Sequence, residues 1–219
     1  MCLIPLTPNS PACERLPEIV RRLRDIHPDA GCTLDHATSF ELLVATMLLT
    51  QCAEERVNQI TPALFARYPT AAALAEAGRS ELEEIIRPTG HSRPKSRFLR
   101  GMAHVLAQEH GGEAPADMAA LLKMPGLSRN TANVVLSVAF GRAEGIVIDP
   151  HVKRLARRLN LTRRNATNKI ERDLMALVPR QDWVDLAYLL IFHGKQVCKT
   201  RQPDCANCVL NDLCPSPGL

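Results

Sequence analysis

The stretch from Leu121 to His151 constrains the fold of this chain more than any other; it reads LLKMPGLSRNTANVVLSVAFGRAEGIVIDPH. Pro125-Gly126 interrupts an apolar run, because proline ends a helix and glycine tolerates a positive φ angle. A second helix should begin near Arg129, since apolar residues then recur at the spacing of one helical face: Ala132, Val135, Leu136 and Ala139. A β-branched link follows and places Asp149 directly before a further helix. The stretch therefore predicts helix, tight hairpin, helix.

A hairpin of this kind exposes successive backbone N–H groups at a helix N-terminus. Such a concavity binds anions, and with lysine and arginine nearby the expected anion is a nucleic-acid phosphate. The candidate contacts are Pro125, Gly126, Leu127, Ser128 and Arg129. An ordinary helical hairpin would show the same pattern, so the residues alone leave both interpretations open.

The segment M-P-G-L-S-R-N-T-A-N-V-V-L, followed by V-I-D-P-H, resembles the helix-hairpin-helix and aspartate of the endonuclease III family of DNA glycosylases. That family has L-P-G-V-G-R-K-T-A-N-V-V-L and then V-D-T-H. The resemblance runs from about Ile19 to Cys214 and implies an all-α protein of two lobes with a DNA groove between them. Residues 32–142 would form a six-helix lobe containing the hairpin, and residues 16–31 with 143–219 an iron–sulfur cluster lobe. Residues 1–15, rich in proline, are expected to be a flexible tail.

Two departures from the family pattern bear on chemistry. Ser128 replaces the second hairpin glycine, and Asn130 stands where the family has its catalytic lysine, which forms a Schiff base with the sugar. A carboxamide nitrogen is not nucleophilic, so the abasic-site lyase activity is predicted to be weak or lost. Lys153 is a possible substitute amine.

Asp149 is the predicted catalytic carboxylate. Breaking an N-glycosidic bond leaves an oxocarbenium-like sugar, whose charge a neighbouring carboxylate stabilises. The same residue is also placed to cap the following helix, and the two roles are compatible.

Four cysteines crowd the C-terminal end with the spacing C-x6-C-x2-C-x5-C: Cys198, Cys205, Cys208 and Cys214. Four thiolates this close in sequence can bind zinc or a [4Fe–4S] cluster, and spacing alone does not choose between them. The spacing matches the iron–sulfur loop of the endonuclease III and adenine glycosylase families. The resemblance therefore implies a structural [4Fe–4S] cluster whose loop presents Lys199 and Arg201 to phosphates.

Three further residues, Gln51, His91 and Lys95, are candidate DNA contacts, and the first two rest on the resemblance. Gln51 matches the glutamine that in the family enters the duplex where the damaged base has left. Gly90 to Lys95 is expected to be an exposed basic loop, and His91 occupies the position of a residue that wedges into the base stack. A solvated loop histidine would be equally compatible with the sequence.

The net charge of +4 is mild, but the cations are segregated. One group contains Arg93, Lys95, Arg97 and Arg100, and the densest contains Lys153, Arg154, Arg157, Arg158, Arg163 and Arg164. In the helix after Asp149 the cations, Arg154 and Arg158 among them, are expected to face outward, where they could follow a DNA backbone. No apolar run approaches the ~20 residues of a membrane span. We expect a monomeric cytoplasmic bacterial protein, associated with the nucleoid through DNA and without a membrane partner.

Local signals predict several helix boundaries. Ser39 is expected to cap a helix, and Ser80 with Glu83 to form a capping box for residues 81–87. Pro62 should interrupt a helix, and Gly194 should end the last one before the cysteines.

Two functions of different class follow. The first is a base-excision-repair glycosylase that acts on duplex DNA with damaged bases, chiefly oxidised pyrimidines, and is reduced to hydrolysis. The second is a catalytically silent protein that binds lesions or abasic sites. An engineered lysine-to-asparagine change would give the same sequence. A zinc-containing transcription factor is a distant alternative that predicts sequence-specific binding.

Overall fold

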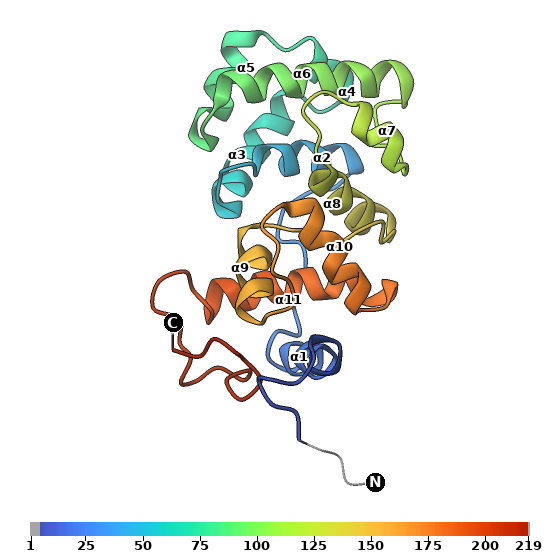
Figure 1. Cartoon of the computed structure of the whole chain (residues 1–219). Helices are drawn as coiled ribbons and strands as arrows, with labels where there is room; N and C mark the ends of the chain where they lie inside the picture. The colour runs from blue at the N-terminus through green and yellow to red at the C-terminus, as the bar shows by residue number, and fades with distance from the viewer. Residues whose placement is uncertain (1–4, 219) are drawn as a thin grey trace. The chain divides into compact units, whose positions relative to one another are not determined.

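The computed structural model describes residues 5–218, and within them every regular element is a helix (Figure 1). This confirms the predicted all-α class. In the same part of the chain no helix is both long enough and apolar enough to cross a membrane.

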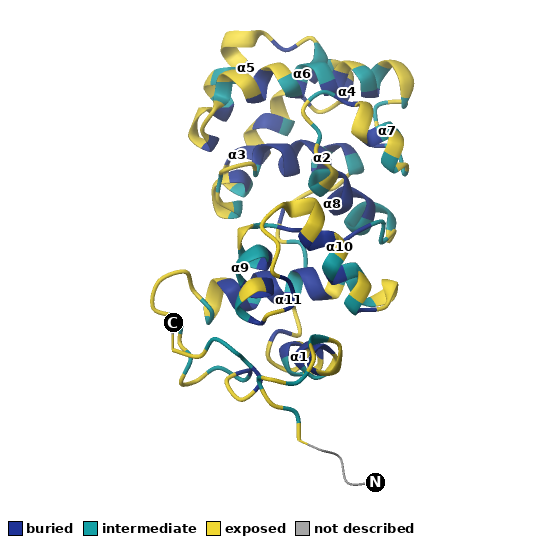
Figure 2. Ribbon diagram, in the orientation of Figure 1, coloured by how far each residue is buried: buried dark blue, intermediate teal, exposed yellow. Residues whose placement is uncertain are grey.

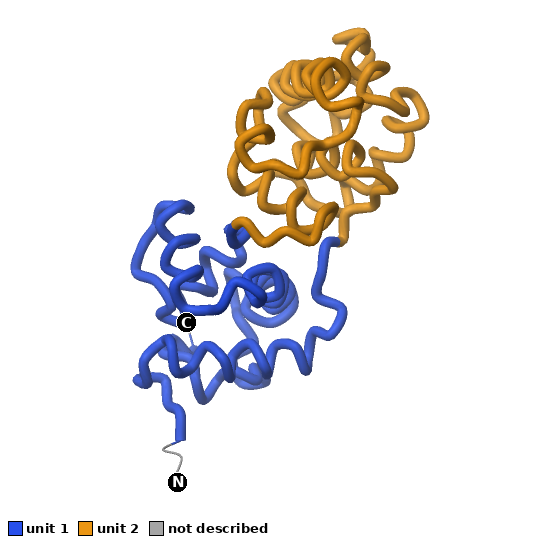
Figure 3. The backbone as a smooth tube through the Cα atoms, turned by 90° about the vertical axis from the view of Figure 1, so that its right-hand side faces the viewer, with its two compact units in different colours: residues 1–32, 145–219 blue, residues 33–144 orange. Residues whose placement is uncertain are grey.

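The chain divides into two compact units (Figure 3). Unit 1 joins the described residues up to Cys32 with those from Gly145 onward, and unit 2 is the continuous segment Thr33–Glu144. Each unit has its own apolar core, so each is described by itself.

Unit 2 is organised around one helix that is apolar on all sides. This helix, α2, is buried from Leu42 to Leu48 (Figure 2), as expected when no polar face is present. Helices α3, α6 and α8 pack against it. The elements of the unit are α2 (Ser39–Leu48), α3 (Glu54–Arg67), α4 (Ala71–Ala75), α5 (Arg79–Ile86), the 3-10 helix η1 (Arg87–Thr89), α6 (Ser92–Glu109), α7 (Met118–Lys123) and α8 (Arg129–Phe140).

Unit 1 is built on its last helix, which buries Leu186, Leu190 and Ile191 and contacts both α1 and α9. A long segment without helix follows it and carries the four clustered cysteines. The elements of the unit are α1 (Ala12–Ile26), α9 (Pro150–Arg158), α10 (Thr167–Leu177), the 3-10 helix η2 (Arg180–Asp182) and α11 (Trp183–Gln196).

Two predicted caps are wrong. Thr38, one residue earlier than predicted, caps α2 by accepting the Glu41 N–H, and Ser39 instead donates its hydroxyl to Glu113 at 2.6 Å. Helix α5 begins after Gly78, which has no side chain to form a cap, so the predicted cap residue Ser80 lies inside the helix, and Glu83 pairs with Arg79 at 2.7 Å on the helix surface.

Two predicted interruptions are also wrong. Helix α3 continues through Pro62, where the buried side chains of Ile60 and Leu64 hold it in place despite the lost backbone hydrogen bond. Helix α11 continues through Gly194 to Gln196. A Cβ atom at Gly194 would lie 3.0 Å from atoms of His151 and Arg154, so this glycine permits the close approach of α9.

The predicted flexible tail, residues 1–15, is too long. Helix α1 begins at Ala12, and Arg15 is only 1% exposed. Its guanidinium donates to the carbonyl oxygens of Leu159 at 2.8 Å and Leu213 at 2.9 Å, which anchors the start of the helix to distant parts of unit 1. Residues 1–4 lie outside the described residues.

Candidate nucleic-acid site and cysteine centre

The hairpin between α7 and α8 is closed by a hydrogen bond from the Leu127 N–H to the Met124 carbonyl at 3.3 Å. Gly126 has a φ angle of +80°, and a Cβ atom there would lie 2.7 Å from the Cβ and Cγ atoms of Phe98 on α6. Both the backbone conformation and this contact therefore require glycine. The turn is held rigidly against α6.

Ser128 acts as the N-cap of α8. Its hydroxyl accepts the Thr131 N–H at 3.1 Å, and its φ of −102° is one that any residue can adopt. Serine in place of the family's glycine therefore causes no strain here, and a cap of this kind contributes about 1 kcal/mol to helix stability. The exposed Ser128 and Arg129 lie at the positive end of the α8 dipole, where an anion is favoured.

Asn130 is the second residue of α8 and is half-buried. Next to it, Arg129 donates one guanidinium N–H to the Glu144 carbonyl at 3.0 Å. The first turn of α8 thus carries a cation and a carboxamide but no amine.

Gln51 and His91 are both exposed and both have left-handed backbones, with φ angles of 55° and 51°. Gln51 lies in the turn between α2 and α3, and His91 follows Gly90 at the start of α6. Gly90 has φ 73° and ψ 160°, a conformation essentially restricted to glycine.

Lys95 is not an exposed DNA contact, and that prediction is wrong. Its side chain is 7% exposed, and its ammonium donates to the carbonyl oxygens of Leu48 and Thr89, both at 2.8 Å. Burial lowers the pKa of this amine. The signal was present in the sequence, because Lys95 precedes Leu99 by four residues and Met102 by seven, on the buried face of α6. Arg93 and Arg97 on the same helix remain exposed.

Asp149 caps α9, as its position predicted. Its carboxylate accepts the Val152 N–H at 2.7 Å. Burial raises the pKa of Asp149, and the hydrogen bond from the Val152 N–H, the neighbouring His151 and the charge of Lys195 oppose this rise. The carboxylate is therefore held in one orientation in a partly desolvated setting.

Lys195 was missed by the sequence reasoning, which named Lys153 as the substitute amine. Lys195 lies exposed on α11, and its charge opposes the rise in the pKa of Asp149. Sequence distance hid it, since 46 residues separate it from Asp149 along the chain. Two amines in unit 1 are thus candidates for contact with an abasic sugar.

All four clustered cysteines line one open pocket, which they share with His193 and Arg158. Burial raises the pKa of Cys208 and Cys214, and the neighbouring cysteines raise it further. Ionising these thiols together is therefore unfavourable unless a positively charged group binds them. Among residues 5–218, no three His, Cys, Asp or Glu side chains converge closely enough to hold a single metal ion.

Hydrogen-bond donors point at two of the four sulfur atoms. The Arg158 guanidinium donates to Cys198 Sγ at 3.3 Å, and the Leu210 N–H donates to Cys208 Sγ at 3.4 Å. His193 Nε2 lies 3.3 Å from Cys208 Sγ, and its other ring nitrogen lies 3.3 Å from His27 Nε2. Such donors stabilise thiolate ligands.

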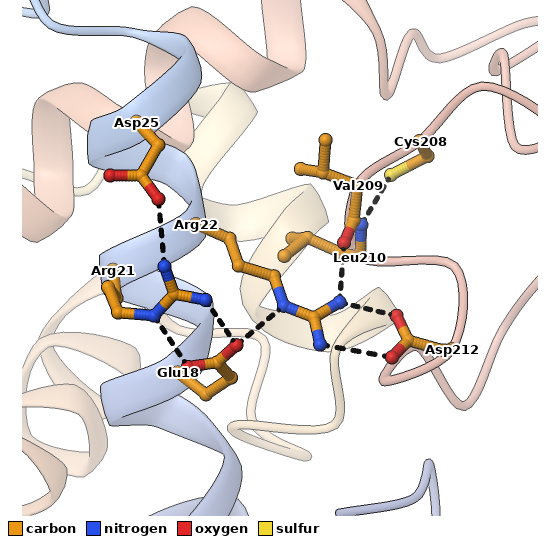
Figure 4. A network of polar contacts seen from close by, with 8 residues as sticks. All are labelled: Glu18, Arg21, Arg22, Asp25, Cys208, Val209, Leu210 and Asp212. Carbon is orange, nitrogen blue, oxygen red and sulfur yellow. Dashed lines mark hydrogen bonds and ion pairs between the residues drawn. The ribbon is translucent and has the colours of Figure 1, made fainter.

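Arg22 fixes the segment that carries the Leu210 donor (Figure 4). Its guanidinium donates to the Val209 carbonyl at 2.8 Å and pairs with Asp212 at 2.6 Å and with Glu18 at 2.8 Å. Together these contacts join α1 to the end of the cysteine segment.

Arg154 and Arg158 do not face outward as predicted. Arg154 donates to the carbonyl oxygens of Cys198 at 3.0 Å and Gly194 at 2.8 Å, and Arg158 donates to that of Lys199 at 2.7 Å. The reason is that the last carbonyl groups of α11 and those at the start of the cysteine segment need partners outside a helix, and α9 presents guanidinium groups to them. Lys199 and Arg201 on this segment are exposed, as a phosphate contact requires.

Comparison with known proteins agrees with this geometry. Residues 44–180 match the model of the HhH-GPD superfamily base excision DNA repair protein. The chain is 48% identical over 203 residues to endonuclease III of Synechocystis sp., covering 93% of both chains, and 36% identical over 197 residues to that of Escherichia coli, covering 90% and 93%. A solved non-covalent endonuclease III–DNA complex superposes with a TM-score of 0.89 at 36% identity, covering 93% of this chain and 95% of the other. The chain therefore belongs to the HhH-GPD superfamily of base excision DNA repair proteins, as an endonuclease III-like DNA glycosylase.

Proposed function

We propose that this protein releases damaged bases, chiefly oxidised pyrimidines, from duplex DNA by hydrolysis and leaves the strand intact. The observation that carries the proposal is a fixed, partly desolvated carboxylate at Asp149 in a chain whose hairpin offers Asn130 instead of an amine. Asp149 supplies the carboxylate for glycosidic-bond cleavage. Asn130, which lacks an amine, removes the Schiff-base route to strand cleavage.

In this mechanism the damaged base leaves its stack, and its glycosidic bond lengthens beside Asp149. The carboxylate stabilises the positive charge that develops on the sugar and orients a water molecule toward C1′. The Val152 N–H holds one carboxylate oxygen at 2.7 Å, so little reorganisation is needed. Burial also raises the pKa of Asp149, which makes it a stronger base toward that water.

DNA binding in the proposal uses three groups of residues. The hairpin residues Gly126, Leu127 and Ser128 bind a phosphate at the N-terminus of α8. Gln51 and His91 enter the base stack at the lesion. Lys199 and Arg201 contact phosphates from the cysteine segment, and the partner is DNA that carries damaged bases or abasic sites.

We also propose that Cys198, Cys205, Cys208 and Cys214 hold a [4Fe–4S] cluster. The residues fit this group, since all four thiols line one pocket and the Arg158 guanidinium and the Leu210 N–H donate to two of their sulfur atoms. The choice of a cluster over a single zinc ion rests on the cysteine spacing, which matches the iron–sulfur loop of the endonuclease III family. When bound, the cluster supplies a charged centre that organises the segment carrying Lys199 and Arg201.

Replacing Cys208 with serine is expected to abolish stoichiometric iron and acid-labile sulfide and to lower the melting temperature. The thiolate that would bind iron is lost, and a serine hydroxyl does not replace it as a cluster ligand. Cys13→Ser, which alters an exposed cysteine on α1, is the matched control and should keep its iron. Full iron content in Cys208→Ser, or zinc in the natural protein, would contradict the assignment.

A silent lesion-binding protein is the second candidate function, and Asn130 is the observation that favours it. Such a protein would use the hairpin, Gln51 and His91 for recognition without releasing a base.

End-labelled duplexes that contain one oxidised pyrimidine separate the two candidates. With excess protein we expect strand breaks only after alkali treatment, because hydrolysis leaves an intact strand with an abasic site. Breaks without alkali, accompanied by a borohydride-trapped adduct, would show that Lys153 or Lys195 supplies the missing amine. No breaks under either condition, with tight lesion binding, would favour the silent protein.

A further inference from the structure

The buried Lys95 side chain connects the turn that contains Gln51 with the loop that contains His91, the two exposed residues of unit 2 described above as having left-handed backbones. Lys95 lies in the first turn of α6, and its ammonium reaches the Leu48 carbonyl and the Thr89 carbonyl at 2.8 Å each. Leu48 is three residues before Gln51, and Thr89 is two residues before His91. A single side chain therefore binds the backbone immediately before both positions.

These two carbonyls are groups that need a partner. Leu48 is the last residue of α2 and Thr89 the last of η1, so their carbonyl oxygens lack partners within their own helices. Both residues are buried, where an unpaired carbonyl is costly. The cation also lies at the negative end of the α2 dipole. The two carbonyl oxygens and the helix dipole therefore explain why the Lys95 side chain, only 7% exposed, is stable in this buried position.

The contact also fixes the backbone of His91. The backbone N–H of Lys95 donates to the His91 carbonyl at 3.1 Å, while its side chain holds Thr89 on the other side of Gly90. Lys95 therefore brackets residues 90–91 from both ends. On the second loop, the Cys52 N–H donates to the Leu49 carbonyl at 2.9 Å and closes the turn that contains Gln51.

Left-handed backbones at non-glycine residues are strained. Such a conformation persists only where the surrounding structure determines it. Gln51 and His91 both adopt this conformation, with both residues exposed. Strain of this kind is useful when it holds a side chain ready for a ligand.

We propose that Lys95 is a positioning residue that fixes the Gln51 turn and the His91 loop as one rigid element for insertion into the base stack. The inference rests on the proposed function, because it assumes that these two side chains enter DNA at a lesion. Lys95 itself does not contact DNA. It prevents the two loops from relaxing independently before binding, so the ordering cost is met during folding.

The test uses duplexes with a tetrahydrofuran abasic analogue opposite 2-aminopurine, together with undamaged duplexes. Lys95→Met removes the donors but keeps an unbranched buried chain. We expect its preference for the abasic over the undamaged duplex to fall about tenfold or more, corresponding to about 1.4 kcal/mol or more. The 2-aminopurine fluorescence change on binding should shrink in parallel. Undamaged-duplex affinity should change little, since no phosphate contact is removed. Lys169→Met, which removes an exposed charge on α10, is the control.

The same substitution in a second variant shows whether Lys95 acts by positioning Gln51 and His91 or by stabilising the protein in general. In a Gln51→Ala/His91→Ala protein the inserting side chains are absent, so adding Lys95→Met should leave the remaining lesion preference unchanged. An equal loss in both backgrounds would overturn the proposal. If Lys95→Met does not fold, Lys95→Gln replaces it in the same cycle. A natural protein without any abasic preference would refute the proposed function itself, whereas a natural preference that Lys95→Met fully retains would refute only the role of Lys95.

Discussion

Asn130→Lys is expected to give strand cleavage at abasic sites without alkali, at a rate on the order of 10²–10⁴ above that of the natural protein. The new amine would stand on the first turn of α8, beside the hairpin between α7 and α8. The positive end of the helix dipole disfavours the ammonium form and so lowers the pKa of an amine placed there. The neutral amine can then attack the sugar C1′ and form a Schiff base that permits β-elimination.

Borohydride trapping measures this outcome directly, because reduction of the Schiff base links protein and DNA covalently. Asn130→Arg is the matched control, since it adds the same charge at the same position without a nucleophilic amine. It should bind abasic DNA at least as tightly as the natural protein and yield no trapped adduct. Equal cleavage by the natural protein and Asn130→Lys would mean that Asn130 does not limit the lyase reaction.

The hairpin could be predicted from sequence because its determinants are local. Pro125-Gly126 breaks the apolar pattern, and the periodic apolar residues of α8 begin four residues after Ser128. Asp149 was predicted as a cap for the same reason, since a carboxylate directly before proline and an amphipathic run is a strong helix-start signal. In both cases the neighbours in sequence are also the partners in space.

The sequence could not show which cations are bound to the protein itself. Arg15 reaches the Leu213 carbonyl across 198 positions, and Arg158 reaches the Lys199 carbonyl across 41. Backbone carbonyls have no signature in a residue pattern, so each of these arginines is as compatible with solvent or phosphate as with a buried acceptor. Lys95 was the exception, because its place on the apolar face of α6 could have been found from periodicity.

The shift from Ser39 to Thr38 has a different origin. Both residues are good caps, and the choice depends on Glu113, which takes the Ser39 hydroxyl from 74 positions away. A tertiary contact thus decides between two locally equivalent helix starts.

Asp149→Asn should abolish most base release and yet stabilise the protein at neutral pH. The carboxamide cannot balance the charge on the sugar, and a loss on the order of 10²–10⁴ in the single-turnover rate is expected. Asparagine caps helices about as well as aspartate, so the hydrogen bond from Val152 should persist. Single-turnover base release and thermal melting of the same preparations measure the two effects.

The pH dependence of the stability gain follows from the direction of the pKa shift. Burial raises the pKa of Asp149 above its ordinary value of 3.8, so the folded protein holds this proton more tightly than the unfolded chain. Its contribution to the free energy of unfolding therefore falls as pH rises from about 3.8 through the folded pKa, and the ionised carboxylate is destabilising above it. The carboxamide of Asp149→Asn does not titrate, so the difference in melting temperature between variant and natural protein should be small near pH 4 and larger at pH 7.

Glu109→Gln is the control for this pH dependence, because it neutralises an exposed carboxylate at the end of α6 and should show no pH-dependent gain. Normal base release by Asp149→Asn would remove Asp149 from the mechanism. A variant that is less stable than the natural protein at neutral pH would show instead that the Asp149 carboxylate serves mainly to hold α9, since the charge itself would then strengthen the cap on Val152.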